Sequence, residues 1–389
     1  MAVTFLDIFN RESQYPIFSR LCDFLPIGGI LNLSRTCRQY AGLYEYLIPV
    51  QWNVDKRLQR FVHDPIGLRS KMGELNAIIS GSFAVQFFER VTWPSSDLDL
   101  YVKEGEEATA LRAYLLQSEG YTLQSHGRSD DLPYAMHNLV NICKYTRLVP
   151  GGKPDQFTEV HVLATSDIPI HAILNGFYTT VVVNVITWNK AFSVFPLVTF
   201  IQKRGYMLQP SDDYFMSLVV KYTQRGWKIQ ETMWPEDHRV NHPLRRYRRI
   251  GDRYSWRIPL DISNVKWSKT PDAVLEFAQF GLSCSEGSYD VLAMVYKSHA
   301  QQYRYTYSDP IWCRFLGRRV TRLTGFELRK SAANLRPPDF QQMVKEETIH
   351  RIELDKPCTW TYWDSEIPKW YEAWEEKYGT ERERQQLPE

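Results

Sequence analysis

The sequence contains the stretch Ala77-Ile78-Ile79-Ser80-Gly81-Ser82-Phe83-Ala84-Val85-Gln86-Phe87-Phe88, followed closely by Ser95-Ser96-Asp97-Leu98-Asp99-Leu100-Tyr101-Val102. The first part has the pattern of a short apolar strand, a Gly-Ser turn and an amphipathic helix, and the second part has the pattern of another strand. Because side chains alternate along a strand, Asp97 and Asp99 are expected to point to one face, while Leu98 and the apolar residues after it point to the core.

The two carboxylates and the turn predict a site for a metal ion and a phosphate-bearing ligand. Two like charges held this close favour a cation between them, and Mg²⁺ takes such carboxylates while phosphates and water fill its other positions. The Gly81-Ser82 turn opens a helix and offers backbone N–H groups to phosphates. Each motif alone is common at ordinary turns and solvated strand ends. Their order, within strand and helix patterns, favours the functional interpretation.

The Gly-Ser turn followed by Asp-Leu-Asp-Leu resembles the signature of the nucleotidyltransferase superfamily, which has the fold of polymerase β. This resemblance implies an α+β fold with a mixed sheet and flanking helices. It also implies that Gly81 and Ser82 hold the triphosphate of an NTP, and that Asp97 and Asp99 bind the catalytic Mg²⁺ or Mn²⁺ ions. The implied reaction transfers a nucleotide from the NTP to an acceptor hydroxyl on an RNA end, a protein or a small molecule.

The strand pattern at 157–163 carries the candidates for a third acidic position. Glu159 and His161 alternate with apolar residues, so both are expected on one face. The resemblance implies a third catalytic and metal-binding carboxylate at about this point in the chain, and Glu159 has the required charge. His161 fits the same position, although a neutral imidazole is a poor ligand for Mg²⁺. Farther along, Lys221 and Arg225 lie one helical turn apart and either bind the nucleotide phosphates or form an ordinary surface pair.

Length and composition limit the class of protein. A chain of 389 residues is long enough for two or three domains. The formal net charge is only +2, so any nucleic-acid-binding surface must be local. The six cysteines form no Cys-x-x-Cys pair, which argues against a zinc site or a disulfide framework. Neither a secretion signal nor an apolar stretch of membrane-spanning length is evident, so we expect a cytoplasmic or nuclear protein without a membrane partner.

The N-terminal segment 14–48 has the spacing of several short helices. Two strings in it, Pro16-Ile17-Phe18-Ser19-Arg20-Leu21-Cys22-Asp23-Phe24-Leu25-Pro26 and Leu31-Asn32-Leu33-Ser34-Arg35-Thr36-Cys37-Arg38-Gln39-Tyr40, look like an F-box. This likeness implies docking on the Skp-type adaptor of a ubiquitin ligase. The usual opening Leu-Pro-x-Glu is missing, and Gly28-Gly29 weakens the second helix. Alternatively, the segment braces the next domain.

Residues 15–260 together resemble a group of fungal proteins that pair a degenerate F-box with a nucleotidyltransferase-like domain. We therefore predict an F-box-like helical unit at 1–50, a nucleotidyltransferase-like core at 51–205 and a mixed C-terminal region at 206–389. The alternative function is that of a catalytically inactive member of the fold that acts as an F-box-like adaptor.

Several further elements are expected from local patterns. Helices are predicted at 52–75, 106–118, 211–231, 272–280 and 368–384, strands at 179–188 and 303–307, a mobile loop at 125–134 and an exposed excursion at 331–357. A dense cation cluster includes Arg245, Arg246, Arg248 and Arg249, interleaved with aromatic residues. This mixture suits phosphate or single-stranded RNA, although a solvated helix face or a partner site has the same composition.

Overall fold

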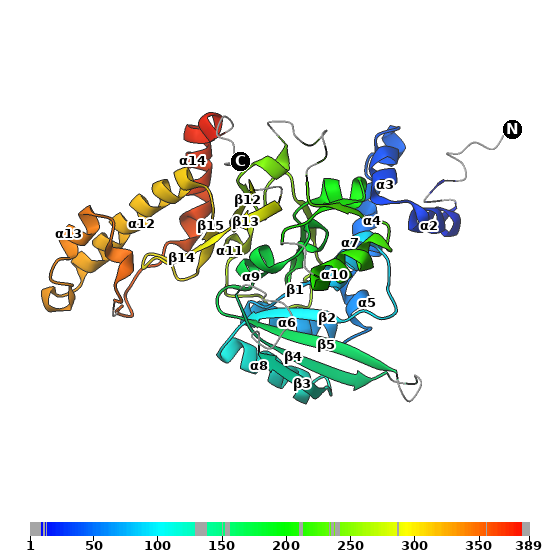
Figure 1. Cartoon of the computed structure of the whole chain (residues 1–389), viewed down its shortest axis with the longest axis horizontal. Helices are drawn as coiled ribbons and strands as arrows, with labels where there is room; N and C mark the ends of the chain where they lie inside the picture. Colours follow the sequence, from blue (N-terminus) through cyan, green and yellow to red (C-terminus); the bar gives the residue numbers. More distant parts are fainter. Residues whose placement is uncertain are drawn as a thin grey trace.

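An eight-stranded mixed sheet with flanking helices forms the centre of this α+β protein (Figure 1). The computed structural model describes residues 9–10, 12, 14–128, 138–149, 151, 156–209, 213–232, 234, 237, 242–285, 288–354 and 356–382. Helices α2 to α4 lie at one end of the molecule, and helices α12 to α14 lie at the other.

The strand order of the large sheet is β11-β7-β6-β1-β2-β5-β4-β3. Its strands are β1 (Ile78–Ser80), β2 (Leu98–Lys103), β3 (Thr122–Arg128), β4 (Leu139–Leu148), β5 (Phe157–Thr165), β6 (Asn184–Ile186), β7 (Lys190–Ser193) and β11 (Trp256–Pro259). The pair β2 and β5 is parallel, and the other neighbouring pairs are antiparallel. Strand β2, which carries Asp99, therefore lies near the middle of the sheet.

The helices are α2 (Tyr15–Phe24), α3 (Ile27–Ser34), α4 (Leu43–Gln51), α5 (Val54–Leu58), α6 (Pro65–Leu75), α7 (Gly81–Glu89), α8 (Glu106–Gln117), α9 (Pro169–Gly176), α10 (Asp213–Thr223), α11 (Ala273–Glu276), α12 (Pro310–Lys330), α13 (Phe340–Lys345) and α14 (Ile367–Arg382). The remaining strands form small separate sheets: β8 (Arg204–Tyr206), β9 (Lys228–Gln230), β10 (Arg248–Arg249), β12 (Gln279–Ser285), β13 (Ser288–Leu292), β14 (Met294–Tyr296) and β15 (Tyr305–Tyr307).

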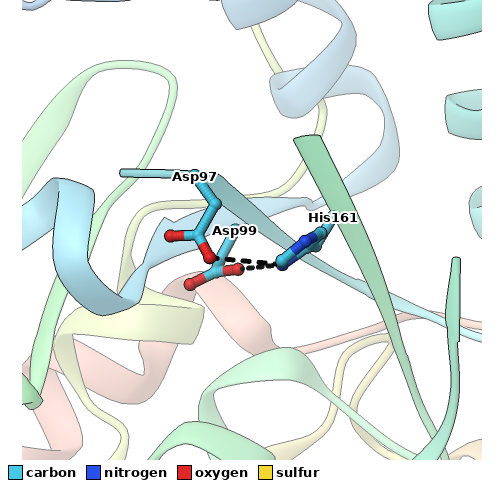
Figure 2. Close-up of side chains that lie close together, drawn as sticks. All are labelled: Asp97, Asp99 and His161. Atoms are coloured by element: carbon cyan, nitrogen blue, oxygen red, sulfur yellow. Dashed lines mark hydrogen bonds and ion pairs between the residues drawn. The ribbon is translucent and has the colours of Figure 1, made fainter. Parts of the chain in front are cut away.

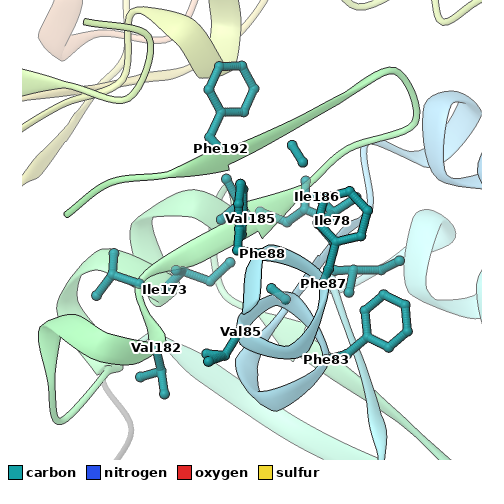
Figure 3. Packing of buried hydrophobic residues seen from close by; sticks show 14 of the residues in the cluster. Ile78, Phe83, Val85, Phe87, Phe88, Ile173, Val182, Val185, Ile186 and Phe192 are labelled. Carbon is teal, nitrogen blue, oxygen red and sulfur yellow. The ribbon is translucent and has the colours of Figure 1, made fainter. Parts of the chain in front are cut away.

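Helix α7 is the buried centre of the core. Its residues from Gly81 to Phe88 are all buried, including the polar Ser82 and Gln86, so the helix is covered on every side and not on one face only, as its amphipathic pattern predicted. Figure 3 shows Phe83, Val85 and Phe87 of this helix among residues of β1, β6 and β7. The helix begins directly after β1, because Gly81 adopts a positive φ of 69° that reverses the chain. The predicted strand, turn and helix are thus confirmed at 78–89.

The hydrophobic core extends beyond the predicted 51–205 unit. Its largest cluster of buried apolar residues runs from Phe9 to Ala293. It includes residues of the N-terminal helices, and β11 joins the large sheet from the segment assigned to the C-terminal region. A second cluster joins β15, α12 and α14, where Trp374 is fully buried. Trp370 and Trp374 of the last helix both pack into this second cluster.

Some predicted elements differ in the structure. The 52–75 segment forms two helices, because Pro65 begins a new one at α6. Residues 125–128 are not a loop: they belong to β3, an edge strand that tolerates polar residues, and 129–134 lie outside the described residues. The strand predicted at 179–188 is shorter in the structure, where only β6 is a strand. The helix predicted at 272–280 is likewise shorter and forms only α11.

None of the helices in the described ranges combines the length and the apolar character needed to cross a bilayer.

Candidate metal centre

The parallel pairing of β2 and β5 brings acidic and imidazole side chains together. Asp99 is the register partner of His161, and Asp97 lies just before β2. Glu159 precedes His161 by two residues on β5, so both side chains lie on the same face. The cluster is therefore built from two strands that are far apart in the sequence.

The imidazole of His161 lies between the aspartates and Glu159. Its Nδ1 is 3.0 Å from Asp99 Oδ1 and 3.6 Å from Asp97 Oδ2. Figure 2 shows both carboxylates facing the ring. Its Nε2 is 2.5 Å from Glu159 Oε1. Ligand atoms of Asp97, Asp99 and His161 all lie within 4.8 Å of one another, so these three residues could together hold a metal ion. Glu159 instead contacts the far side of the ring.

The Gly-Ser turn directly contacts both aspartates. Ser82 Oγ donates a hydrogen bond to Asp97 Oδ1 at 3.1 Å. Gly81 lies so close to Asp99 that a Cβ at this position would overlap the Asp99 Oδ2 atom. The N-terminus of α7 therefore lies beside the acidic pair, and its dipole favours negative charge at this position.

Burial and charge together determine the protonation of this cluster. Burial alone lowers the pKa of His161, but hydrogen bonding to Asp99, the charges of both aspartates and the contact with Glu159 outweigh it and raise the pKa to about 9. The metal-free cluster thus holds an imidazolium at neutral pH. Burial and the Asp97 carboxylate raise the pKa of Asp99, and the hydrogen bond to His161 opposes that rise.

Helix α10 and the turn that follows it contribute one cation each, Lys221 and Arg225. The charge of Lys221 favours the ionised form of Asp99. Arg225 stacks on the Trp93 ring, with its Cζ 3.6 Å from the ring centroid, and its buried Nη1 has no hydrogen-bond partner among the residues that the structure describes. The structure thus brings Lys221 near the acidic pair, and it places Arg225 against the loop that leads to Asp97.

A polar cavity of about 520 Å³ opens beside Asp97 and Glu159. Arg60 lines it and donates hydrogen bonds to Ser96 Oγ at 3.2 Å and to Pro94 O at 2.5 Å. Sequence reasoning did not single out Arg60. The signal was the group of three cations, Lys56, Arg57 and Arg60, within five residues in and just after α5.

The arginine cluster at 245–249 has mainly internal roles. Arg248 is 2% exposed and forms a double hydrogen bond with Asp252, at 2.9 Å for each contact. Arg249 donates to the carbonyl of Gly251 and stacks on aromatic rings. Arg246 donates to the hydroxyl of Tyr254, and the Arg245 side chain lies outside the described residues. Arg248 and Arg249 therefore stabilise the fold and do not form an external phosphate surface.

No protein-family model matches the chain, and no curated protein and no solved structure matches it either.

Proposed function

We propose that the protein is a metal-dependent nucleotidyltransferase with a nucleotidyltransferase-like core. The observation that supports this proposal most directly is the position of Asp97 and Asp99 against the Gly81-Ser82 turn, with His161 beside both carboxylates. The candidate metal site adjoins a helix N-terminus, which is a natural binding site for phosphates. The combination suits an NTP held with its metal ion.

Each residue of the cluster has a distinct role in this proposal. Asp97 and Asp99 hold Mg²⁺ or Mn²⁺, while the first turn of α7 and Lys221 hold the triphosphate. A bound ion of this kind neutralises charge on the triphosphate and lowers the barrier to attack by an acceptor hydroxyl. The geometry favours His161 over Glu159 as the third ligand, because His161 contacts both aspartates. Since imidazole suits transition metals, Mn²⁺ is the better match.

Nucleotide binding tests the site directly. Purified protein should bind an NTP more tightly with Mn²⁺ than with a chelator, and the Asp97→Ala/Asp99→Ala double variant should lose this difference. Circular dichroism must show a retained fold in the double variant, because the change also removes two carboxylates that pair with the His161 imidazolium. Asp339→Ala, an exposed residue outside the cluster, is the control. Equal metal-dependent binding by the double variant would rule out this site.

Turnover tests the third position. Transfer of a labelled nucleotide should be weak, and His161→Gln should reduce it because a ligand is lost. If Glu159→Gln abolishes transfer while His161→Gln retains it, the third ligand is Glu159. A large gain in His161→Asp would indicate that the native chain is a lapsed transferase.

An adaptor without turnover is the second candidate function. It is favoured by the His161 imidazolium, which already neutralises the acidic pair in the absence of a metal ion. Helix α2 also exposes apolar side chains, among them Phe24 at 73% exposure and Ile17 at 46%. If this unit is a working F-box, a Skp-type adaptor should be retained in a pull-down and lost with Phe24→Arg. Retention by neither form, together with nucleotide transfer, would exclude this role.

A further inference from the structure

Helix α12 presents a continuous basic face to solvent. Its exposed residues, apart from Pro310 at its start, are only arginine, lysine and phenylalanine: Arg314, Arg318, Arg322, Phe326, Arg329 and Lys330. The first four follow one another at intervals of four residues, so they form one stripe along the helix. At about 1.5 Å per residue, the stripe from Arg314 to Phe326 is about 18 Å long.

The stripe has few acidic partners. A solvated, salt-bridged helix normally alternates acids and bases on its surface, but the only carboxylate of α12, Glu327, is buried and paired with Lys330 at 2.7 Å. Within the described ranges, Arg318 has an exposed ion pair with Glu347 at 3.5 Å, and no ion pair is found for Arg314 or Arg322. This concentration of charge contrasts with the near balance of the whole chain.

The opposite face of α12 is already occupied by the protein. Trp312, Leu316 and Val320 are buried in the second hydrophobic cluster, together with Trp374 of α14. The helix therefore has no apolar face left to enter a lipid bilayer, as a membrane-surface helix would require. Figure 1 shows α12 in the lobe at the end of the molecule opposite to α2.

The side chains of the stripe match the chemistry of a nucleic-acid strand. Guanidinium groups bind phosphates through paired N–H donors, and arginine predominates here over lysine. Phe326 continues the stripe with a ring that is 50% exposed, and the Lys330 ammonium lies 4.5 Å from its centroid. An exposed aromatic ring within a basic stripe is the combination on which unpaired bases stack.

We propose that the α12 stripe binds single-stranded nucleic acid, with Arg314, Arg318 and Arg322 on the phosphates and Phe326 on a base. The proposal is independent of nucleotide transfer at the metal centre. It assigns nucleic-acid contacts to helix α12 and not to the arginine cluster at 245–249, which includes strand β10.

Fluorescence anisotropy of the full chain with a labelled single-stranded oligoribonucleotide, between about 50 and 200 mM salt, tests the proposal. The Arg314→Gln/Arg318→Gln/Arg322→Gln variant loses three phosphate contacts. Its plot of log affinity against log salt should therefore be less steep, with the magnitude of the negative slope smaller by about 2. Phe326→Ala should weaken binding about tenfold and leave the slope unchanged, because stacking releases no counterions. The matched control removes three exposed arginines from the N-terminal unit: Arg20→Gln/Arg35→Gln/Arg38→Gln.

Several results would overturn the assignment. Equal losses in the stripe and control variants would show that only net charge matters. Stripe-dependent binding to vesicles of anionic lipid or to a polyglutamate peptide, without RNA binding, would assign a different partner. If the triple glutamine variant does not fold, the triple lysine variant replaces it and should retain the native salt slope. Phe326→Ala then decides the question, because an unchanged RNA affinity of Phe326→Ala refutes the proposal.

Discussion

Replacing His161 with glutamine removes the imidazolium that Asp97, Asp99 and Glu159 surround. The pKa of His161 rises from its ordinary 6.5 to about 9 in the folded protein, and only 13% of the side chain is exposed. Since one pKa unit corresponds to about 1.4 kcal/mol, the protonated form stabilises the folded state by about 3 kcal/mol.

The sign of this effect follows from the raised pKa. The stabilisation is fully present below pH 6.5, where His161 is protonated in both the folded and the unfolded state, and it is lost as the pH rises through about 9. The free energy of unfolding of the native chain, relative to that of His161→Gln, should therefore fall by about 3 kcal/mol between about pH 6 and pH 10.

Urea unfolding in chelator across this pH range measures the difference directly. His63→Gln is the control, because His63 is an exposed histidine that lines the polar cavity beside Asp97 and Glu159. This variant should show the same dependence of unfolding free energy on pH as the native chain. Mn²⁺ requires a neutral imidazole, so its stabilising effect on the native chain should increase toward pH 9. If the unfolding free energies of the native chain and His161→Gln change in parallel with pH, the imidazolium of His161 does not stabilise the folded state.

Three further predictions concern the core. Gly81→Ala should lower the free energy of unfolding by at least about 1 kcal/mol, because position 81 has a left-handed φ; urea unfolding measures this. It should also abolish metal-dependent NTP binding in a titration, because the added Cβ overlaps Asp99. Arg69→Met should destabilise by about 3 kcal/mol in urea, because the partly exposed Asp55 carboxylate and the carbonyls of Trp188 and Asp261 lose the buried donor that they share; an unchanged midpoint would contradict this. Deleting residues 1–48 should make the remainder insoluble, because the N-terminal helices share its core; a soluble product with a native unfolding temperature would contradict this.

The helical N-terminal unit illustrates how local patterns and tertiary contacts combine. Its helices were predicted from apolar spacing and occur at α2 to α4. Their attachment depends on Arg90, which donates to Cys22 O at 3.1 Å and also to the Leu25 carbonyl and the Gln51 side chain. No local pattern indicates these partners, because they lie far from Arg90 in the sequence.

Helix α12 was not predicted from the sequence. Its pattern was present in the sequence, since Trp312, Leu316 and Val320 recur at intervals of four residues and Asp309 precedes the helix as an N-cap. Only the structure shows that this apolar side is buried against α14, which leaves the arginines of the opposite side in solvent.

The sequence by itself determined the elements whose causes are local. The strand at 78–80, the left-handed turn at Gly81, the helix that follows and the alternation of Asp97 and Asp99 all depend on residues close to one another in the chain. Tertiary structure decided which partner the aspartates meet. Glu159 and His161 share one face of β5, so the alternation of side chains cannot tell which of them lies beside the aspartates. The parallel register with β2 decides this, because it pairs His161 with Asp99.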